Sequence, residues 1–159
     1  MKLITLSLLL SLSSLWAQNS YSTKSNWLLD TQGNEQKFKA IQKQFRGFDL
    51  AMVEVGYRFN TFYFAIKDKN YDLAHYQWDK IKKAIENGTQ RRPKREENSK
   101  GMFLDTQYAV MKDLLDKKDD KRILEAYEKT KQLCNACHHA EKVPFIKVVN
   151  PQYRWQPIR

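Results

Sequence analysis

The sequence predicts an all-α protein, an antiparallel four-helix bundle with an extended C-terminal tail. Apolar residues recur at steps of three and four along most of the chain, which is the spacing of one helix face. Short polar connections separate these stretches, and no stretch alternates apolar and polar residues as a half-buried strand would. Helices joined by short connections pack against each other as antiparallel neighbours. The length of 159 residues corresponds to one domain.

The longest pattern predicts a helix from Phe38 to Ile66. Its apolar residues follow one another at alternating steps of three and four: Phe38, Ile41, Phe45, Phe48, Met52, Val55, Phe59, Phe62 and Ile66. A continuous helix of this length would extend for about 40 Å. Gly47 and Gly56 lie inside the pattern, and each costs about 1 kcal/mol relative to alanine. Either glycine could mark a kink or a close approach of another group.

A second helix is predicted from Tyr71 to Ile85, with Asn87-Gly88 as its C-terminal stop. Residues 89–100 are basic and polar, and we expect a solvated connection there. Pro93 lies within it and could open a short helical turn.

A third helix is predicted from Leu104 to Leu115, ending near Lys117-Lys118. Asp119 or Asp120 can cap a fourth helix, which Pro144 ends. The inner face of this fourth helix is expected to carry Ile123, Tyr127, Thr130, Cys134 and Cys137.

The N-terminus predicts export. Lys2, an apolar run from Leu3 to Leu15 and the small residue Ala17 have the order of a secretory signal peptide, residues 1–17. The run is shorter than the roughly 20 apolar residues of a membrane span, although an uncleaved N-terminal anchor is the alternative. We therefore expect a periplasmic protein with no integral membrane span after cleavage. The remaining divisions are an N-terminal extension (18–34), the helical bundle (35–143) and the C-terminal tail (144–159).

The chain is basic. It has 28 Lys and Arg against 18 Asp and Glu, a net charge of +10, which removal of the signal peptide with Lys2 lowers to +9. Such a charge favours an acidic partner protein or an anionic surface. No motif that reads a nucleic-acid groove is present, so a nucleic-acid partner is not expected.

The segment Cys134-Asn135-Ala136-Cys137-His138 has the C-x-x-C-H spacing of a c-type haem attachment site. On a helix, residues three and four apart share one face. Cys134 and Cys137 can therefore each form a thioether with one vinyl group of the same haem. His138 is one turn beyond Cys134, and we expect its imidazole to be the proximal iron ligand.

Two other chemistries compete for the same cysteines. A redox-active disulfide would use a C-x-x-C pair, but such pairs follow a strand in a βαβ setting. A structural zinc site takes four ligands, and besides the motif only His139 is close in sequence. Covalent attachment of one haem c is the favoured interpretation.

A helical bundle with this motif on its last helix resembles the cytochrome c′ family, the class II c-type cytochromes. In that family a basic residue near the haem follows the motif histidine by four positions, and Lys142 occupies that position here. The resemblance implies a single covalently bound haem. It also implies a possible homodimer formed through the first two helices.

The sixth iron ligand is the open question. Met52 lies in the middle of the first pattern and is the tentative distal ligand, because a thioether is a soft ligand suited to haem iron. Core packing or a steric lid over an open iron face are the alternatives for Met52. Weaker ligand candidates are His75, Met102 and Met111, and candidates near the haem propionates are His139, Arg46, Arg58 and Lys142.

These expectations lead to two functions. A single haem on a small, basic, exported protein suits electron transfer to an acidic redox partner, which a sixth protein ligand would favour. The alternative is a five-coordinate haem that binds a small gas such as nitric oxide or carbon monoxide. The chain shows no obvious distal acid/base pair, so an enzyme is not expected.

Overall fold

The computed structural model describes residues 26–155, 157 and 158, and this part of the chain is all-helical without a strand. The predicted all-α class is therefore confirmed. The predicted signal peptide lies outside the described residues. The chain divides into two units, residues 1–40 and 41–159, so residues 35–40 of the predicted bundle fall in the first unit. Among the described helices, none combines the length and the apolar character needed to cross a membrane.

The predicted helix from Phe38 to Ile66 is wrong as a single element, because it is interrupted before Phe48. The first part is α1 (Asn34–Gln44), which has no buried residue. The side chains of Phe38 and Phe45 are 70% and 56% exposed. At the interruption, Arg46 adopts a left-handed φ of 55°. The Phe45 carbonyl accepts a hydrogen bond from the guanidinium of Arg91 at 3.3 Å instead of a helical partner.

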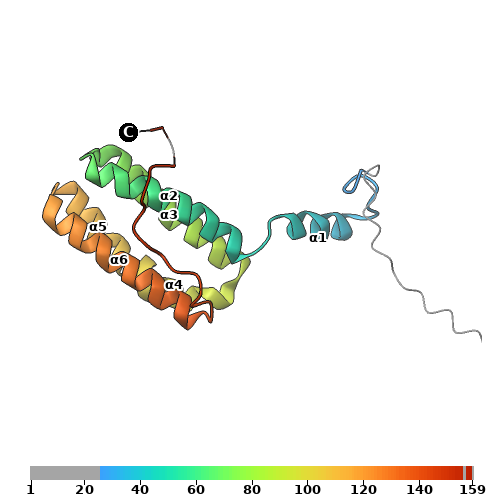
Figure 1. The fold of residues 1–159 in the computed structure, drawn as a ribbon. Coiled ribbons are helices and arrows are strands. Elements are labelled where there is room, and N and C mark those ends of the chain that lie inside the picture. The colour runs from blue at the N-terminus through green and yellow to red at the C-terminus, as the bar shows by residue number, and fades with distance from the viewer. Residues whose placement is uncertain (1–25, 156, 159) are drawn as a thin grey trace, which may run out of the picture. The chain divides into compact units, whose positions relative to one another are not determined.

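The helices α2 (Phe48–Lys67) and α3 (Tyr71–Arg91) pack side by side over their whole length (Figure 1). Gly88 makes their close contact possible. A Cβ atom at Gly88 would lie 2.8 Å from the Cβ of Ala51 and 2.9 Å from the ring of Phe48. The prediction that Gly88 stops the helix is therefore wrong, since α3 continues to Arg91. This glycine is required by the neighbouring helix, not by a turn.

The expected solvated connection after α3 is mostly helical. It consists of a 3₁₀ turn η1 (Pro93–Arg95), a short helix α4 (Glu96–Ser99) and a π-helical turn η2 (Lys100–Leu104). Pro93 opens the first of these turns, as predicted.

The last two helices are α5 (Gln107–Asp116) and α6 (Asp120–Ala140), which pack on each other (Figure 1). The predicted cap of the final helix is confirmed, because the Asp119 carboxylate accepts a hydrogen bond from the backbone N–H of Arg122 at 3.2 Å.

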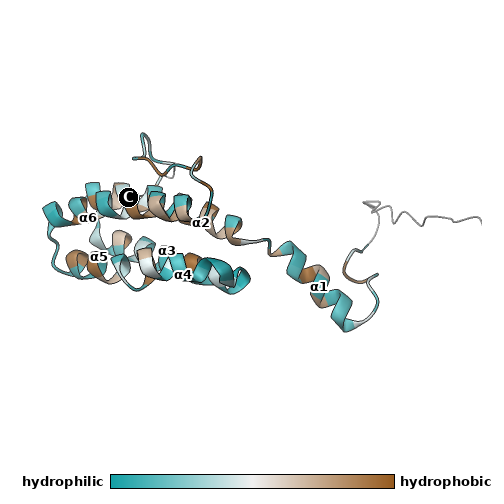
Figure 2. Cartoon of the chain, turned by 90° about the horizontal axis from the view of Figure 1, so that it is seen from below, coloured by the Kyte–Doolittle hydropathy of each residue, from teal (hydrophilic) through white to brown (hydrophobic). Residues whose placement is uncertain are grey.

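An aromatic core joins α2, α3, α6 and η2. The ring of Phe59 stacks on Tyr127 with centroids 4.7 Å apart, and Trp78 lies 4.9 Å from Phe62 and 5.0 Å from Phe103. All five side chains are buried. Hydrophobic and hydrophilic residues share each of these helices, as expected for helices that bury one face (Figure 2).

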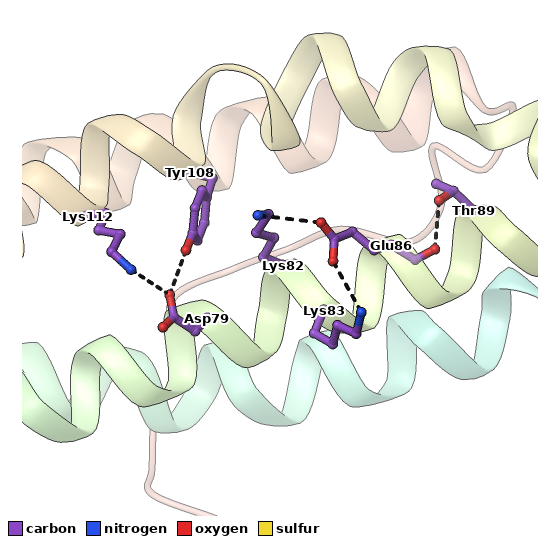
Figure 3. A network of polar contacts seen from close by, with 7 residues as sticks. All are labelled: Asp79, Lys82, Lys83, Glu86, Thr89, Tyr108 and Lys112. Atoms are coloured by element: carbon purple, nitrogen blue, oxygen red, sulfur yellow. Dashed lines mark hydrogen bonds and ion pairs between the residues drawn. The ribbon is translucent and has the colours of Figure 1, made fainter.

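A polar network on the surface links α3 to α5 (Figure 3). The Tyr108 hydroxyl donates to the Asp79 carboxylate at 2.7 Å, and Lys112 lies 3.5 Å from the same carboxylate. The Tyr108 carbonyl accepts from the indole N–H of Trp78 at 3.0 Å. Burial and the neighbouring carboxylate raise the pKa of Tyr108, so its hydroxyl stays a hydrogen-bond donor at neutral pH.

Three of the long helices end in the same way, with a lysine in the left-handed conformation. The φ angles of these lysines are 58° for Lys69, 52° for Lys118 and 62° for Lys142. At the end of α6, the N–H of Val143 bonds the His138 carbonyl at 2.8 Å, five residues back. This is the Schellman pattern, in which glycine is the usual residue.

Candidate functional site

The predicted haem-binding residues lie on the last two turns of α6. Cys134, Cys137 and His138 are all half-buried, and both cysteines are free thiols. Toward the N-terminus of α6, the same face continues into the buried residues Thr130 and Tyr127. The two thiols and the imidazole therefore continue the stripe of α6 that faces the core.

The environment of the thiols does not suit redox chemistry. Burial raises the pKa of Cys134 to about 12, and burial also raises the pKa of Cys137. Redox-active C-x-x-C pairs instead have a thiol with a lowered pKa, since the thiolate is the nucleophile. At neutral pH both thiols here are protonated, which disfavours the redox-disulfide alternative. Within the described part, no group of three or more His, Cys, Asp or Glu is arranged to hold a metal ion.

The imidazole of His138 is oriented by the chain that follows α6. Its Nδ1 lies 2.7 Å from the carbonyl oxygen of Ile146. A carbonyl oxygen only accepts hydrogen bonds, so Nδ1 must carry the proton. In the neutral ring this leaves the lone pair on Nε2, which is the tautomer a histidine needs to bind a metal. The half-buried ring is thus held with its ligating nitrogen free.

The chain reaches this position through a tight turn. After Lys142, the N–H of Ile146 bonds the Val143 carbonyl at 3.0 Å, which closes a β-turn with Pro144 in its second position. Pro144 therefore forms the turn after the helix. The prediction that it ends the helix is wrong, because α6 stops at Ala140, ahead of the left-handed Lys142.

Asn135, the residue between the motif cysteines, anchors the returning chain. Its side-chain oxygen accepts from the N–H of Val148 at 2.8 Å, and its amide donates to the Val148 carbonyl at 2.9 Å. No role for Asn135 was predicted from the sequence. The one available signal was that asparagine is unfavourable inside a helix unless its side chain has another partner.

After Val148, the chain continues across to α2 (Figure 1). Asn60 of α2 repeats the arrangement, since its amide donates to the Tyr153 carbonyl at 3.1 Å and its oxygen accepts from the N–H of Trp155 at 3.3 Å. Arg154 forms an ion pair with Asp68 at 2.8 Å. We call residues 143–155 the strap, because this segment connects the end of α6 to α2.

On both α2 and α6, one stretch of core-facing residues is less buried than the rest. On α2, Phe59 and Phe62 are buried, whereas Phe48, Met52 and Val55 are only partly buried. The same change occurs along α6, between the buried Thr130 and the half-buried cysteines. Both helices thus leave apolar surface partly uncovered, α2 in its first turns and α6 around the two thiols and His138. These residues fit a covalently bound haem, which would cover that surface.

The remaining ligand candidates have other surroundings. Met111 is fully buried in the core, and Met102 is half-buried on η2. His75 lies 3.2 Å from Asp116 between α3 and α5, which agrees with a helix-flank histidine.

The basic candidates are also engaged or exposed. Arg46 pairs with Asp49, and Arg58 lies 2.8 Å from Glu54 in the same helix. His139 and Lys142 are exposed at the end of α6.

Comparison with known proteins does not assign the chain to a family. No family model matches the chain, and no curated protein or solved structure is significantly similar to it. The functional conclusion therefore depends on the site itself.

Proposed function

We propose that this protein is an exported mono-haem c-type cytochrome that transfers electrons. The observation that carries the proposal is the hydrogen bond from His138 Nδ1 to the Ile146 carbonyl, next to two thiols at the attachment spacing. This combination supplies covalent attachment points and a pre-oriented iron ligand on one helix face. The half-buried, protonated thiols fit thioether attachment better than they fit the role of a redox-active disulfide.

We also propose that α2, α3, α5 and α6 form an antiparallel bundle with the tail as an extended strap. Two contacts support opposite directions for α2 and α6. Tyr71, just after α2, bonds Asp120 at the start of α6, and Phe59 within α2 stacks on Tyr127 further along α6.

This arrangement brings Met52 to the level of the motif. Met52 lies seven residues before Phe59, and Cys134 lies seven residues after Tyr127. Seven residues are two helical turns, so each keeps the face of its stacked partner and is displaced by about 10 Å. In antiparallel helices both displacements lead to the same end. Met52 is therefore the residue that would supply the sixth ligand of the iron.

A haem in this site would supply an iron that changes oxidation state, with its electronic character set by the axial ligands. Cys134 and Cys137 would hold the group covalently, and His138 Nε2 would bind the iron. The apolar side chains of Phe48 and Val55 would exclude water from this end. The excess of basic residues would guide transient docking with an acidic redox partner, and docking should weaken as salt increases.

The second candidate function is the binding of a small gas by a five-coordinate iron. The partial burial of Met52 favours it, because the side chain already packs against the core cluster. A thioether engaged in packing would act as a lid over the iron instead of a ligand.

The test is expression in a host that attaches c-type haem, followed by reduced visible spectra with and without carbon monoxide. We expect covalent haem in the wild type and none in Cys134→Ala/Cys137→Ala. We also expect that carbon monoxide leaves the reduced spectrum of the wild type unchanged. The reduced Met52→Ala variant should instead bind carbon monoxide. Absence of covalent haem from the wild type would refute the proposal, whereas ready binding of carbon monoxide would favour the gas-binding function.

A further inference from the structure

We infer that Asn135 is a positioning residue for the iron ligand and that it acts through the strap. Its side chain fixes the backbone at Val148, and this holds the Ile146 carbonyl against Nδ1 of His138. The inference rests on the proposed function, because it assigns a second layer of residues to the same haem site.

The two pairs of contacts have matching geometry. Asn135 and His138 are three residues apart on α6, so their side chains leave the same side of the helix. Their partners, Val148 and Ile146, are two residues apart on the strap, in the reverse order. The strap therefore runs back along the last turns of α6 and is bonded to it at both positions.

The two hydrogen bonds of Asn135 are the main polar contacts that hold this part of the strap. The turn that precedes it is closed by the single bond from Ile146 to Val143. The side chains of Ile146 and Lys147 are exposed, so they contribute little packing. Among the described hydrogen bonds, the next anchor is Lys131 to Asn150 at 2.6 Å. Val148 is half-buried and packs on the core, so water has restricted access to the pair.

The consequence for the site is chemical as well as structural. A hydrogen bond from Nδ1–H to a carbonyl fixes the ring orientation and increases the basicity of Nε2. A more basic ligand stabilises the ferric state and lowers the reduction potential. Loss of the anchor at Val148 would release the Ile146 carbonyl, so the His138 ring would rotate and its Nδ1 proton would exchange with water.

The experiment compares Asn135→Ala with Asn60→Ala in the haem-loaded protein. The Asn60 side chain also forms two hydrogen bonds with the strap, at Tyr153 and Trp155. These bonds lie beyond the segment from Ile146 to Val148 that orients His138. The readouts are the midpoint potential and the solvent exchange of the His138 Nδ1 proton by NMR. Asn135→Asp keeps the acceptor for the Val148 N–H and replaces the donor with a negative charge, so this variant is compared by proton exchange alone.

In Asn135→Ala we expect a higher midpoint potential and proton exchange faster by about tenfold, the order of the loss in metal affinity or activity when a partner of a metal-bound histidine is removed. Asn60→Ala should change neither readout, and the proton-exchange rate of Asn135→Asp should lie between those of Asn135→Ala and the wild type. Equal responses of Asn135→Ala and Asn60→Ala would overturn the inference and leave Asn135 a purely structural role.

The two proposals fail in different ways. If the wild type carries no covalent haem, the proposed function fails. The inference about Asn135 is then decided by the tautomer of His138 in the full chain, measured by ¹⁵N NMR. A shift away from the Nδ1–H tautomer in Asn135→Ala alone would support it, and an unchanged tautomer would refute it.

Discussion

The two ends of the α2–α6 pair use the same apolar spacing but are packed differently. At the closed end, Phe59 to Ile66 on α2 and Ile123 to Thr130 on α6 supply buried side chains. In the proposed antiparallel arrangement, the other end carries Phe48 to Val55 and Cys134 to His138, whose inward residues are mostly half-buried. We call it the motif end. The spacing therefore determines which face points inward, whereas the packing partners determine whether that face is covered. The uncovered end is the one with the thiols and the free Nε2.

The largest effect should come from shortening a side chain at the closed end. Phe62 is fully buried, so Phe62→Ala should lower the free energy of unfolding by about 3–5 kcal/mol. Phe48→Ala at the motif end should cost only about 1–2 kcal/mol in the chain without haem, because the Phe48 ring is half-buried. Urea denaturation of both variants in the Cys134→Ala/Cys137→Ala background measures the difference. Equal losses in the free energy of unfolding would show that the two ends are packed alike.

A smaller effect is expected where α2 and α3 approach most closely. Gly88→Ala should destabilise the protein by about 1–3 kcal/mol, since its Cβ would lie 2.8 Å from that of Ala51. Gly56→Ala is the matched control, because a Cβ there has no heavy atom within 4 Å. That control should gain about 0.5–1 kcal/mol in the free energy of unfolding. Thermal unfolding of both variants tests this, and a stable Gly88→Ala protein would contradict the close contact.

The smallest effect concerns the acid stability of the closed end. The pKa of Asp120 is lowered by hydrogen bonds from Lys69 and Tyr71. A lowered folded-state pKa stabilises the fold above the unfolded value of about 3.9, and this contribution is lost as the pH falls through the folded value. Asp120→Asn should therefore be less stable than the wild type at pH 7, and the difference should shrink toward pH 2.

Urea midpoints measured across this pH range test the expectation. Asp113→Asn is the control, because among the described ion pairs its carboxylate contacts Lys117, four residues along the chain, at 2.7 Å. A difference between Asp120→Asn and the wild type that persists unchanged at pH 2 would rule out this linkage.

The errors in the sequence analysis share one cause. The spacing from Phe38 to Phe48 is helical throughout, but it could not show that the chain would adopt a left-handed conformation at Arg46. Gly88 looked like a stop because glycine commonly ends helices, whereas its role depends on Ala51 in a neighbouring helix. Local patterns report what a segment prefers, and they carry no information about a partner distant in sequence.

By itself the sequence determined the all-α class, the existence of α2, α3, α5 and α6, an aspartate cap at Asp119 or Asp120 and the motif from Cys134 to His138. These features depend on residues within a few positions of one another, so periodicity and spacing are enough to predict them. Only the tertiary structure decided that the Ile146 carbonyl meets His138 and that Asn135 binds Val148. Both contacts form because the chain reverses after α6, and a backbone carbonyl has no signature in the sequence.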